Sequence, residues 1–326
     1  MIKKFISYYK PHKKLFILDM VCAFFIAVLD LVFPVVTKNF INDYIPNGNV
    51  SLMIRWTIYL AILFLLRYIA QYIVNYWGHV VGVRIEHDMR RDIFEHLQTL
   101  SFTYFDKNKT GHIMSRIVND LREITELAHH GPEDLFISLV MLIGSFIILI
   151  RIEWRLTLII FAFVPIMIWF AISKRNKMSE SFRQVRKKIA NVNSQLENSI
   201  SGIRVAKSYT NEDYEIDKFA EGNEAFMVAR QASYKVMAEF MSGINFMSNV
   251  LNLIVLSVGG LFVYKGIIKY GDLAAYILFV NHFLQPIRRL TEFAQQYQDG
   301  MTGFERFMEI MNIEHDIVDS ENAVEL

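Results

Sequence analysis

The chain has 326 residues, of which 53% are hydrophobic and 21% charged, and its formal net charge is +1. The apolar fraction is slightly above the roughly 45–50% usual for soluble domains, so the distribution of the apolar residues decides the class. A single cysteine, Cys22, excludes a disulfide within the chain. The apolar residues gather in six blocks: 15–37, 53–76, 135–150, 156–172, 246–264 and 273–290. Most approach the roughly 20 residues that a helix needs to cross a bilayer, which predicts an all-α, multi-pass membrane protein.

Lysine and arginine are concentrated in three places: before the first block, after the second and after the fourth. The segments on the other side of the membrane carry few of them. Because cytoplasmic loops are enriched in Lys and Arg, both termini and both long polar segments are predicted to lie in the cytoplasm of a cell-membrane protein. The basic clusters then set topology beside lipid headgroups, and no nucleic-acid partner is predicted.

In chain order, residues 1–10 place apolar side chains on one helical face and predict a helix at the membrane surface. Residues 52–104 predict one helix that extends far beyond the second block. A turn at 107–111 and a short helix at 112–118 follow it. Only the RIEWR segment, 151–155, separates the third and fourth blocks, which predicts a tight antiparallel hairpin.

The fourth block continues as a polar helix to about residue 201, where the segment 202–215 (GIRVAKSYTNEDYE) reverses the chain. The sixth block is expected to continue as a helix to about 313. A chain that carries helices far out of the membrane and returns them needs a contact there. The two polar reversals, 105–121 and 202–215, are therefore predicted contact surfaces; solvated turns are the alternative.

Three local patterns give the chain a resemblance to the membrane domain of an ATP-binding-cassette (ABC) exporter. They are YFDKNKTGHIMSRIVNDL at 104–121, ENSISGIRVAKSYTNEDYEIDKF at 197–219, and FLQPIRRL at 283–290. In this order they resemble the first and second intracellular loops and the sixth helix of the family. The resemblance covers essentially the whole chain. It implies six transmembrane helices with long cytoplasmic extensions and a domain-swapped dimer, in which the fourth and fifth helices pack against the partner.

The resemblance further implies that each loop ends in a short coupling helix that docks on a nucleotide-binding domain, near residues 111–117 and 208–213. Tyr209 occupies the position of the family's docking aromatic residue. The residues assigned to coupling are Gly111, His112, Met114, Ser115, Arg116, Ser208, Tyr209, Thr210, Asn211, Glu212 and Asp213. ATP closes the two cassettes in this mechanism, and the docked helices switch the cavity from inward-facing to outward-facing.

No Gly-x-x-x-x-Gly-Lys-Ser/Thr phosphate loop occurs in the sequence. Catalytic and cofactor-binding residues are therefore not predicted here. ATP and Mg²⁺ are implied for a nucleotide-binding domain outside this sequence, and the whole would be an ATP-hydrolysing translocase. Residues 1–313 are assigned to the membrane domain and 314–326 to a linker toward that nucleotide-binding domain. The pair His129–His130 lacks an evident set of further ligands in the sequence, and no metal site is predicted.

Polar side chains within apolar blocks are costly unless they face water or a partner, so they are candidates for the substrate cavity. They are Arg67, Asn245, Asn249, Asn252, Asn281, His282 and Gln285. The three asparagines of the fifth block follow one helical face. They are expected to face the cavity or, alternatively, to form hydrogen bonds between helices.

The function predicted is export of a hydrophobic or amphipathic molecule, with lipid, peptide and haem export as alternatives within the family. A non-pumping channel, or a sensor that docks a cytoplasmic partner, is the competing class. The second six-helix domain can be an identical copy or a related chain.

Overall fold

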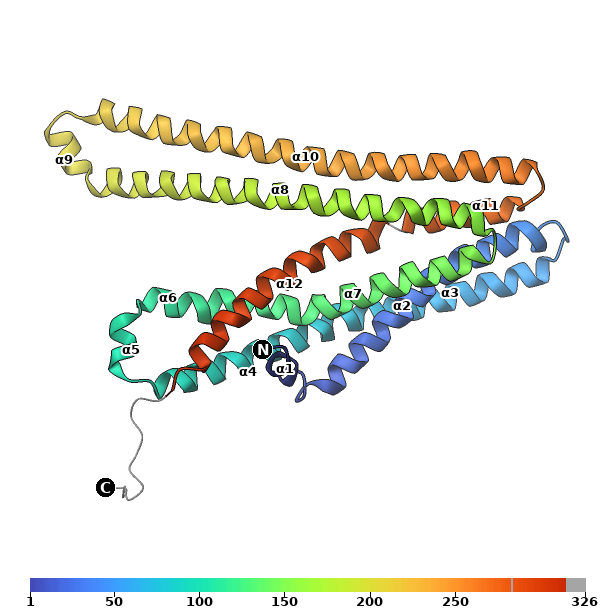
Figure 1. The fold of residues 1–326 in the computed structure, drawn as a ribbon, viewed down its shortest axis with the longest axis horizontal. Coiled ribbons are helices and arrows are strands. Elements are labelled where there is room, and N and C mark those ends of the chain that lie inside the picture. Colours follow the sequence, from blue (N-terminus) through green and yellow to red (C-terminus); the bar gives the residue numbers. More distant parts are fainter. Residues whose placement is uncertain (283, 315–326) are drawn as a thin grey trace, which may run out of the picture. The chain divides into compact units, whose positions relative to one another are not determined.

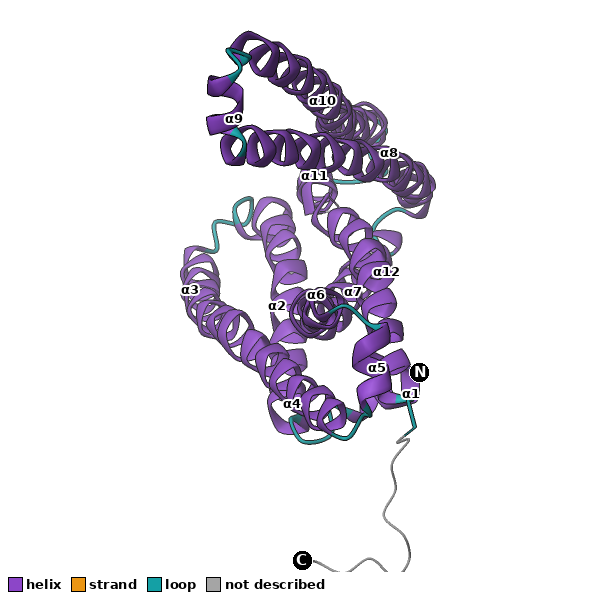
Figure 2. Ribbon diagram, turned by 90° about the vertical axis from the view of Figure 1, so that its left-hand side faces the viewer, coloured by secondary structure: helices purple, strands orange, loops and turns teal. Residues whose placement is uncertain are grey.

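The computed structural model describes residues 1–282 and 284–314. This part of the chain consists of helices and short loops and contains no strand (Figure 2), so the all-α prediction is confirmed. Its long helices are α2 (Lys13–Asn39), α3 (Val50–Ile73), α4 (His79–Gln98), α7 (Leu121–Ile150), α8 (Trp154–Ser201), α10 (Glu212–Tyr264), α11 (Tyr270–His282) and α12 (Leu284–Met311). Its short helices are α1 (Ile2–Ser7), α5 (Phe102–Lys107), α6 (Thr110–Ser115) and α9 (Ile203–Ser208).

Three five-residue π-helical segments continue helices: the first extends α2, the second joins α3 to α4, and the third joins α6 to α7. They are η1 (Phe40–Tyr44), η2 (Val74–Gly78) and η3 (Arg116–Asp120). Through η2, α3 and α4 form one continuous helix, Val50–Gln98. The prediction of a single long helix over 52–104 is confirmed as far as residue 98. Ser101, in an extended conformation, separates it from α5.

Five helices of the described residues are long and apolar enough to cross a membrane. They are Lys13–Tyr44, Val50–Gln98, Thr110–Ile150, Trp154–Ser201 and Glu212–Tyr264, and they contain the first five predicted blocks. The sixth block, 273–290, is shared between α11 and the first residues of α12, with residue 283 outside the described part. The predicted linker 314–326 lies outside the described residues except for Glu314.

The chain forms two compact units, one of residues 1–157 and 255–326, the other Leu158–Ile254. In the first unit, α7 packs against α12, α2 and α4. Glycines permit the close approach of α12, since a Cβ atom added at Gly303 would lie 3.1 Å from the backbone oxygen of Asp120. A Cβ atom added at Gly300 would likewise lie too close to the side chain of Leu127.

An apolar core lies where α1, α4, α6, α7 and α12 meet. From α4 it receives Ile85, Met89 and Ile93, all fully buried. Phe304 and Phe307 of α12 enter it as a stacked pair with ring centroids 5.8 Å apart. The spacing of four residues along α4 places its apolar side chains on one face. This core supports the first polar loop.

Polar contacts hold the N-terminal segment against the same core. The Tyr8 hydroxyl donates to Asp92 Oδ2 at 2.9 Å, and the Tyr9 hydroxyl donates to the backbone oxygen of Ala128 at 2.7 Å. Burial, with the hydrogen bond to Asp92 as the next cause, raises the pKa of Tyr8, so the hydroxyl remains a donor. His12 Nε2 lies 2.8 Å from Asp88 Oδ2.

At the other end of the first unit, hydrogen bonds join α11 to η1 and to the α7–α8 turn. The amide of Gly271 donates to Asn42 Oδ1 at 2.8 Å. The buried hydroxyl of Tyr276 contacts the backbone oxygens of Leu149 and Glu153 at 2.9 and 2.8 Å. These contacts fix the end of the unit that lies opposite the polar loop.

The second unit is a hairpin of α8 and α10, which run antiparallel and are joined through α9 (Figure 1). Gly222 and Gly243 of α10 let Gln195 and Phe170 of α8 approach the backbone. Lys174 Nζ and Glu239 Oε2 form an exposed ion pair at 2.6 Å.

Candidate functional site

The first predicted coupling segment, 111–117, coincides with α6 and the start of η3. Ile113 is 8% exposed and belongs to the apolar core. The side chains around it point outward, and Met114 is 59% exposed. Gly111, His112 and Ser115 are also exposed, while Arg116 is half-buried. Ile113 thus anchors α6 and leaves its other face open for a partner.

Two ion pairs connect this first loop to α12. Arg306 binds Asp120 with two contacts, Nε to Oδ2 at 2.9 Å and Nη2 to Oδ1 at 3.0 Å. Arg116 Nη2 lies 3.2 Å from Glu309 Oε2. A paired guanidinium–carboxylate contact is geometrically specific, so α6 and α12 are expected to move together. Sequence reasoning did not identify Asp120, Arg306 or Glu309.

The second short helix is Ile203–Ser208 and shares only Ser208 with the helix implied at 208–213, so the bounds of that helix are corrected. The assignment of residues 208–213 to coupling stays a prediction. Gly202 interrupts α8 and precedes α9. Ser208 is the last residue of α9, residues 209–211 form the turn, and α10 begins at Glu212. The carboxylates of Glu212 and Asp213 lie in the first turn of α10, where unpaired backbone N–H groups favour negative charge.

Tyr209 is the most prominent apolar surface of this second loop. Its side chain is 81% exposed, and the residue borders a cavity of about 420 Å³ lined also by Gly202, Val205 and Glu215. A large aromatic side chain this exposed is typical of a binding residue when a partner can cover it. Its assignment to coupling stays a prediction.

The turn after α9 is a Schellman motif with threonine where glycine is usual. The amide of Asn211 donates to the backbone oxygen of Ala206 at 2.9 Å, and that of Thr210 to Lys207 at 3.4 Å. Thr210 has a φ of 53°, in the left-handed region that a β-branched residue rarely adopts.

Thr210→Gly is expected to stabilise this turn by about 0.5 to 1 kcal/mol, because glycine adopts positive φ without steric cost. Hydrogen exchange at the Asn211 amide should slow severalfold. Thr210→Ala is the matched control, since it removes the side chain but keeps the Cβ atom. Equal protection in the two variants would contradict the strained-turn explanation.

Within the first unit, α2, α3, α7 and α12 enclose a polar cavity of about 220 Å³. Arg67 binds Asp30 on its wall through Nε to Oδ1 at 2.9 Å and Nη2 to Oδ2 at 3.2 Å. Arg289 lies 3.0 Å from Asp134 Oδ1 and 3.8 Å from Glu133 Oε1. Gln71 and Gln285 also line the cavity. Charges inside membrane-spanning helices mark substrate or ion pathways.

Of the residues predicted for the substrate cavity, Arg67 and Gln285 line this polar cavity. Asn281 is exposed on α11 and His282 is half-buried. The three asparagines lie on the α10 part of the second unit, with Asn245 and Asn249 exposed and Asn252 half-buried. Arg289 was not identified from the sequence. Asp30 was recognised as a carboxylate inside the first apolar block, but it was not among the residues predicted for the substrate cavity.

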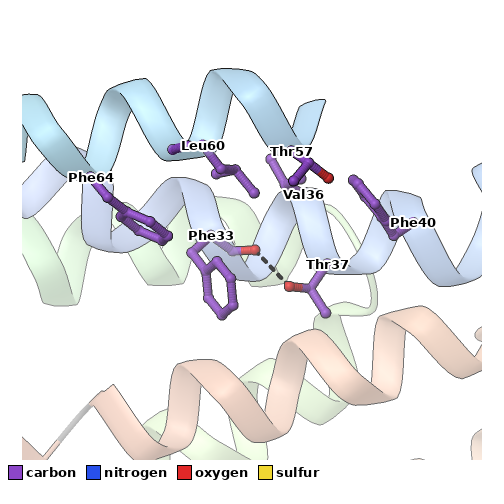
Figure 3. A pocket seen from close by; sticks show the side chains of 8 residues that line it. Phe33, Val36, Thr37, Phe40, Thr57, Leu60 and Phe64 are labelled. Atoms are coloured by element: carbon purple, nitrogen blue, oxygen red, sulfur yellow. Dashed lines mark hydrogen bonds between the residues drawn. The ribbon is translucent and has the colours of Figure 1, made fainter. Parts of the chain in front are cut away.

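An apolar groove of about 410 Å³ lies between the C-terminal part of α2 with η1 and the adjoining part of α3 (Figure 3). Phe33, Leu60 and Phe64 face each other across it, and the rings of Phe33 and Phe64 have centroids 6.1 Å apart. The Thr37 hydroxyl donates to the backbone oxygen of Phe33 at 2.9 Å, so this polar group is satisfied within its own helix.

The apolar groove and the polar cavity lie next to each other along α2 and α3. Asp30 precedes Phe33 on α2, and Phe64 precedes Arg67 on α3, by three residues in each case. Residues three apart lie on the same helical face. The α2–α3 interface therefore presents an apolar surface and a charged one about one helical turn apart.

A family model described as the ABC transporter transmembrane region matches residues 16–287. The chain belongs to this family. Its all-α structure, with five helices long and apolar enough to cross a membrane among the described residues, is consistent with such a domain. The resemblance deduced from the two loops and the sixth helix is confirmed.

The chain is 40% identical over 323 residues to the uncharacterized ABC transporter ATP-binding protein YwjA of Bacillus subtilis, and the match covers 99% of this chain and 56% of that protein. It is 26% identical over 325 residues to an ATP-dependent lipid A-core flippase of Syntrophus aciditrophicus, covering 99% of this chain and 54% of that protein. The chain thus spans about half the length of the curated relatives it matches.

Proposed function

We propose that this membrane domain moves a hydrophobic or amphipathic molecule out of the cytoplasm by alternating access, driven by ATP hydrolysis in a nucleotide-binding domain. The α2–α3 interface carries the proposal, because its apolar groove adjoins a cavity with charges of both signs. A molecule with an apolar body and a polar head matches both surfaces. The lipid A-core flippases among the relatives support a lipid within this class.

The membrane domain is proposed to span the cell membrane with both termini and both polar loops in the cytoplasm, as the Lys and Arg distribution favours. The outward face of α6 and the exposed Tyr209 are the proposed docking surfaces for the nucleotide-binding domain, which would bind ATP and Mg²⁺. The Asp120–Arg306 pair would transmit a displacement of α6 to α12.

A second membrane domain, identical or related, is proposed to complete the translocation path. The hairpin Leu158–Ile254 forms a compact unit by itself, as expected of helices that exchange between two subunits. Asn245 and Asn249 are exposed on it and would face either the shared cavity or the partner's helices.

Leu60→Trp tests the proposed substrate site, because the larger side chain would fill the groove. In the complete transporter, we expect the concentration of an amphipathic lipid analogue that half-maximally stimulates ATP hydrolysis to rise about tenfold, which corresponds to about 1.4 kcal/mol.

Leu65→Trp is the matched control, since Leu65 is 61% exposed on the same helix and does not line the groove. Equal stimulation in both variants and the parent would contradict the groove as a binding surface. Passive flux of the analogue without ATP would favour the channel alternative.

A further inference from the structure

Three histidines converge where α4 approaches α7. His79 begins α4, and His129 and His130 are consecutive in α7. Each offers a ring nitrogen, and these nitrogens lie within 4.8 Å of one another. The ring centroids are 4.3 to 5.3 Å apart. The sequence showed only the pair His129–His130, whereas the fold adds a third imidazole from a distant segment.

A buried carboxylate with an unused acceptor borders this histidine cluster. Asp19 of α2 is 2% exposed, and its Oδ1 atom is buried without a hydrogen-bond partner among the described residues. Asp19, His129 and Glu133 also place ligand atoms within 4.8 Å of one another. Buried carboxylates are normally paired or bound to a metal. A cation beside Asp19 would satisfy this acceptor.

Carboxylates also lie near two of the imidazole rings. Glu133 Oε2 lies 3.9 Å from His129 Nε2, and Glu126 Oε2 lies 3.7 Å from His130 Nε2. Histidines that bind metals commonly direct their second ring nitrogen toward a carboxylate, which orients the ring and increases its basicity.

The glycine at residue 78 leaves room for the imidazole ring of His129. A Cβ atom added at Gly78 would lie 2.2 Å from His129 Cε1 and 3.0 Å from Asp19 Oδ1. Gly78 is the last residue of η2, and π-helical insertions are frequent at functional sites. Any side chain at residue 78 would displace His129 from the cluster.

We infer that His79, His129 and His130 bind a divalent transition-metal cation of the zinc class, with Asp19 supplying negative charge beside it. Imidazole nitrogens favour zinc, copper and nickel over magnesium or calcium. Zinc–nitrogen bonds of about 2.0–2.1 Å in a tetrahedral site place the nitrogens about 3.4 Å apart. Because the three nitrogens lie within 4.8 Å of one another, each pair has to approach by at most about 1.4 Å. His79 is exposed, so the histidine cluster opens to the surface of the chain.

The test is Co²⁺ binding to the full chain, purified without a histidine tag and first treated with a chelator. We expect one Co²⁺ per chain, with visible absorption typical of four- or five-coordinate cobalt and displacement by Zn²⁺. His79→Gln should weaken binding at least about tenfold, as loss of metal-site partners typically does. His87→Gln is the matched control, because His87 is exposed on the same helix outside the histidine cluster.

His79→Cys provides a rescue, since thiolate is a zinc and cobalt ligand. It should restore binding and add a sulfur-to-cobalt charge-transfer band. Absence of stoichiometric Co²⁺ binding in the parent would overturn the inference. So would equal weakening by His79→Gln and His87→Gln, or a His79→Cys variant without the new band, since these results would identify scattered surface sites.

Discussion

Replacing Arg67 with methionine is expected to destabilise the membrane domain at the α2–α3 interface. The substitution leaves the carboxylate of Asp30 without its two contacts from the guanidinium, at 2.9 and 3.2 Å. Removing one partner of a buried pair costs about 3–5 kcal/mol. Because these side chains are 36% and 23% exposed, we expect a loss of about 2 kcal/mol in the free energy of unfolding in mixed micelles.

The double variant Asp30→Asn, Arg67→Met separates the unpaired charge from the loss of packing. It removes the carboxylate together with its partner, so most of the stability should return. Substrate-stimulated ATP hydrolysis should remain impaired in the complete transporter if Arg67 also contacts the polar part of the substrate. A single Arg67→Met variant as stable as the parent would show that the pair does not hold α2 against α3.

Apolar periodicity made much of the fold predictable. The first five blocks predict the five helices that are long enough to cross a membrane. Along α4, Met89, Ile93 and Leu97 recur every four residues and are buried in the core of the first unit. These features depend on local sequence and on a period of 3.6 residues, so no tertiary information is needed to find them.

The second loop shows where the family resemblance misplaced a helix. The resemblance implied a short helix near 208–213, whereas the polar residues themselves indicated a reversal of the chain. The backbone of Thr210 enters the left-handed region, and α9 ends at Ser208. A threonine carries no strong signal for this conformation, since glycine or asparagine is usual there. The short helix is therefore formed by the preceding residues, Ile203–Ser208.

Contacts between distant segments were also out of reach. Asp120 and Arg306 meet because glycines on α12 allow it to approach α7 closely. His79 joins His129 because Gly78 leaves space for the ring. Neither pairing has a spacing that a single sequence can display. Arg67 and Gln285 were found because intramembrane polarity is itself a local signal.

Tyr209→Ala tests the central claim, that the polar loops couple this membrane domain to a nucleotide-binding domain. In the complete transporter reconstituted in liposomes, we expect ATP-dependent transport of the lipid analogue to fall at least about tenfold, as loss of an interface anchor worth 1.4 kcal/mol or more would cause. Tyr214→Ala is the matched control, since Tyr214 is a 60% exposed aromatic in the first turns of α10.

The measurement is transport per ATP hydrolysed, compared between the two variants and the parent. The coupling account predicts a low ratio for Tyr209→Ala and an unchanged ratio for Tyr214→Ala, with both proteins folded. An unchanged ratio for Tyr209→Ala would contradict it.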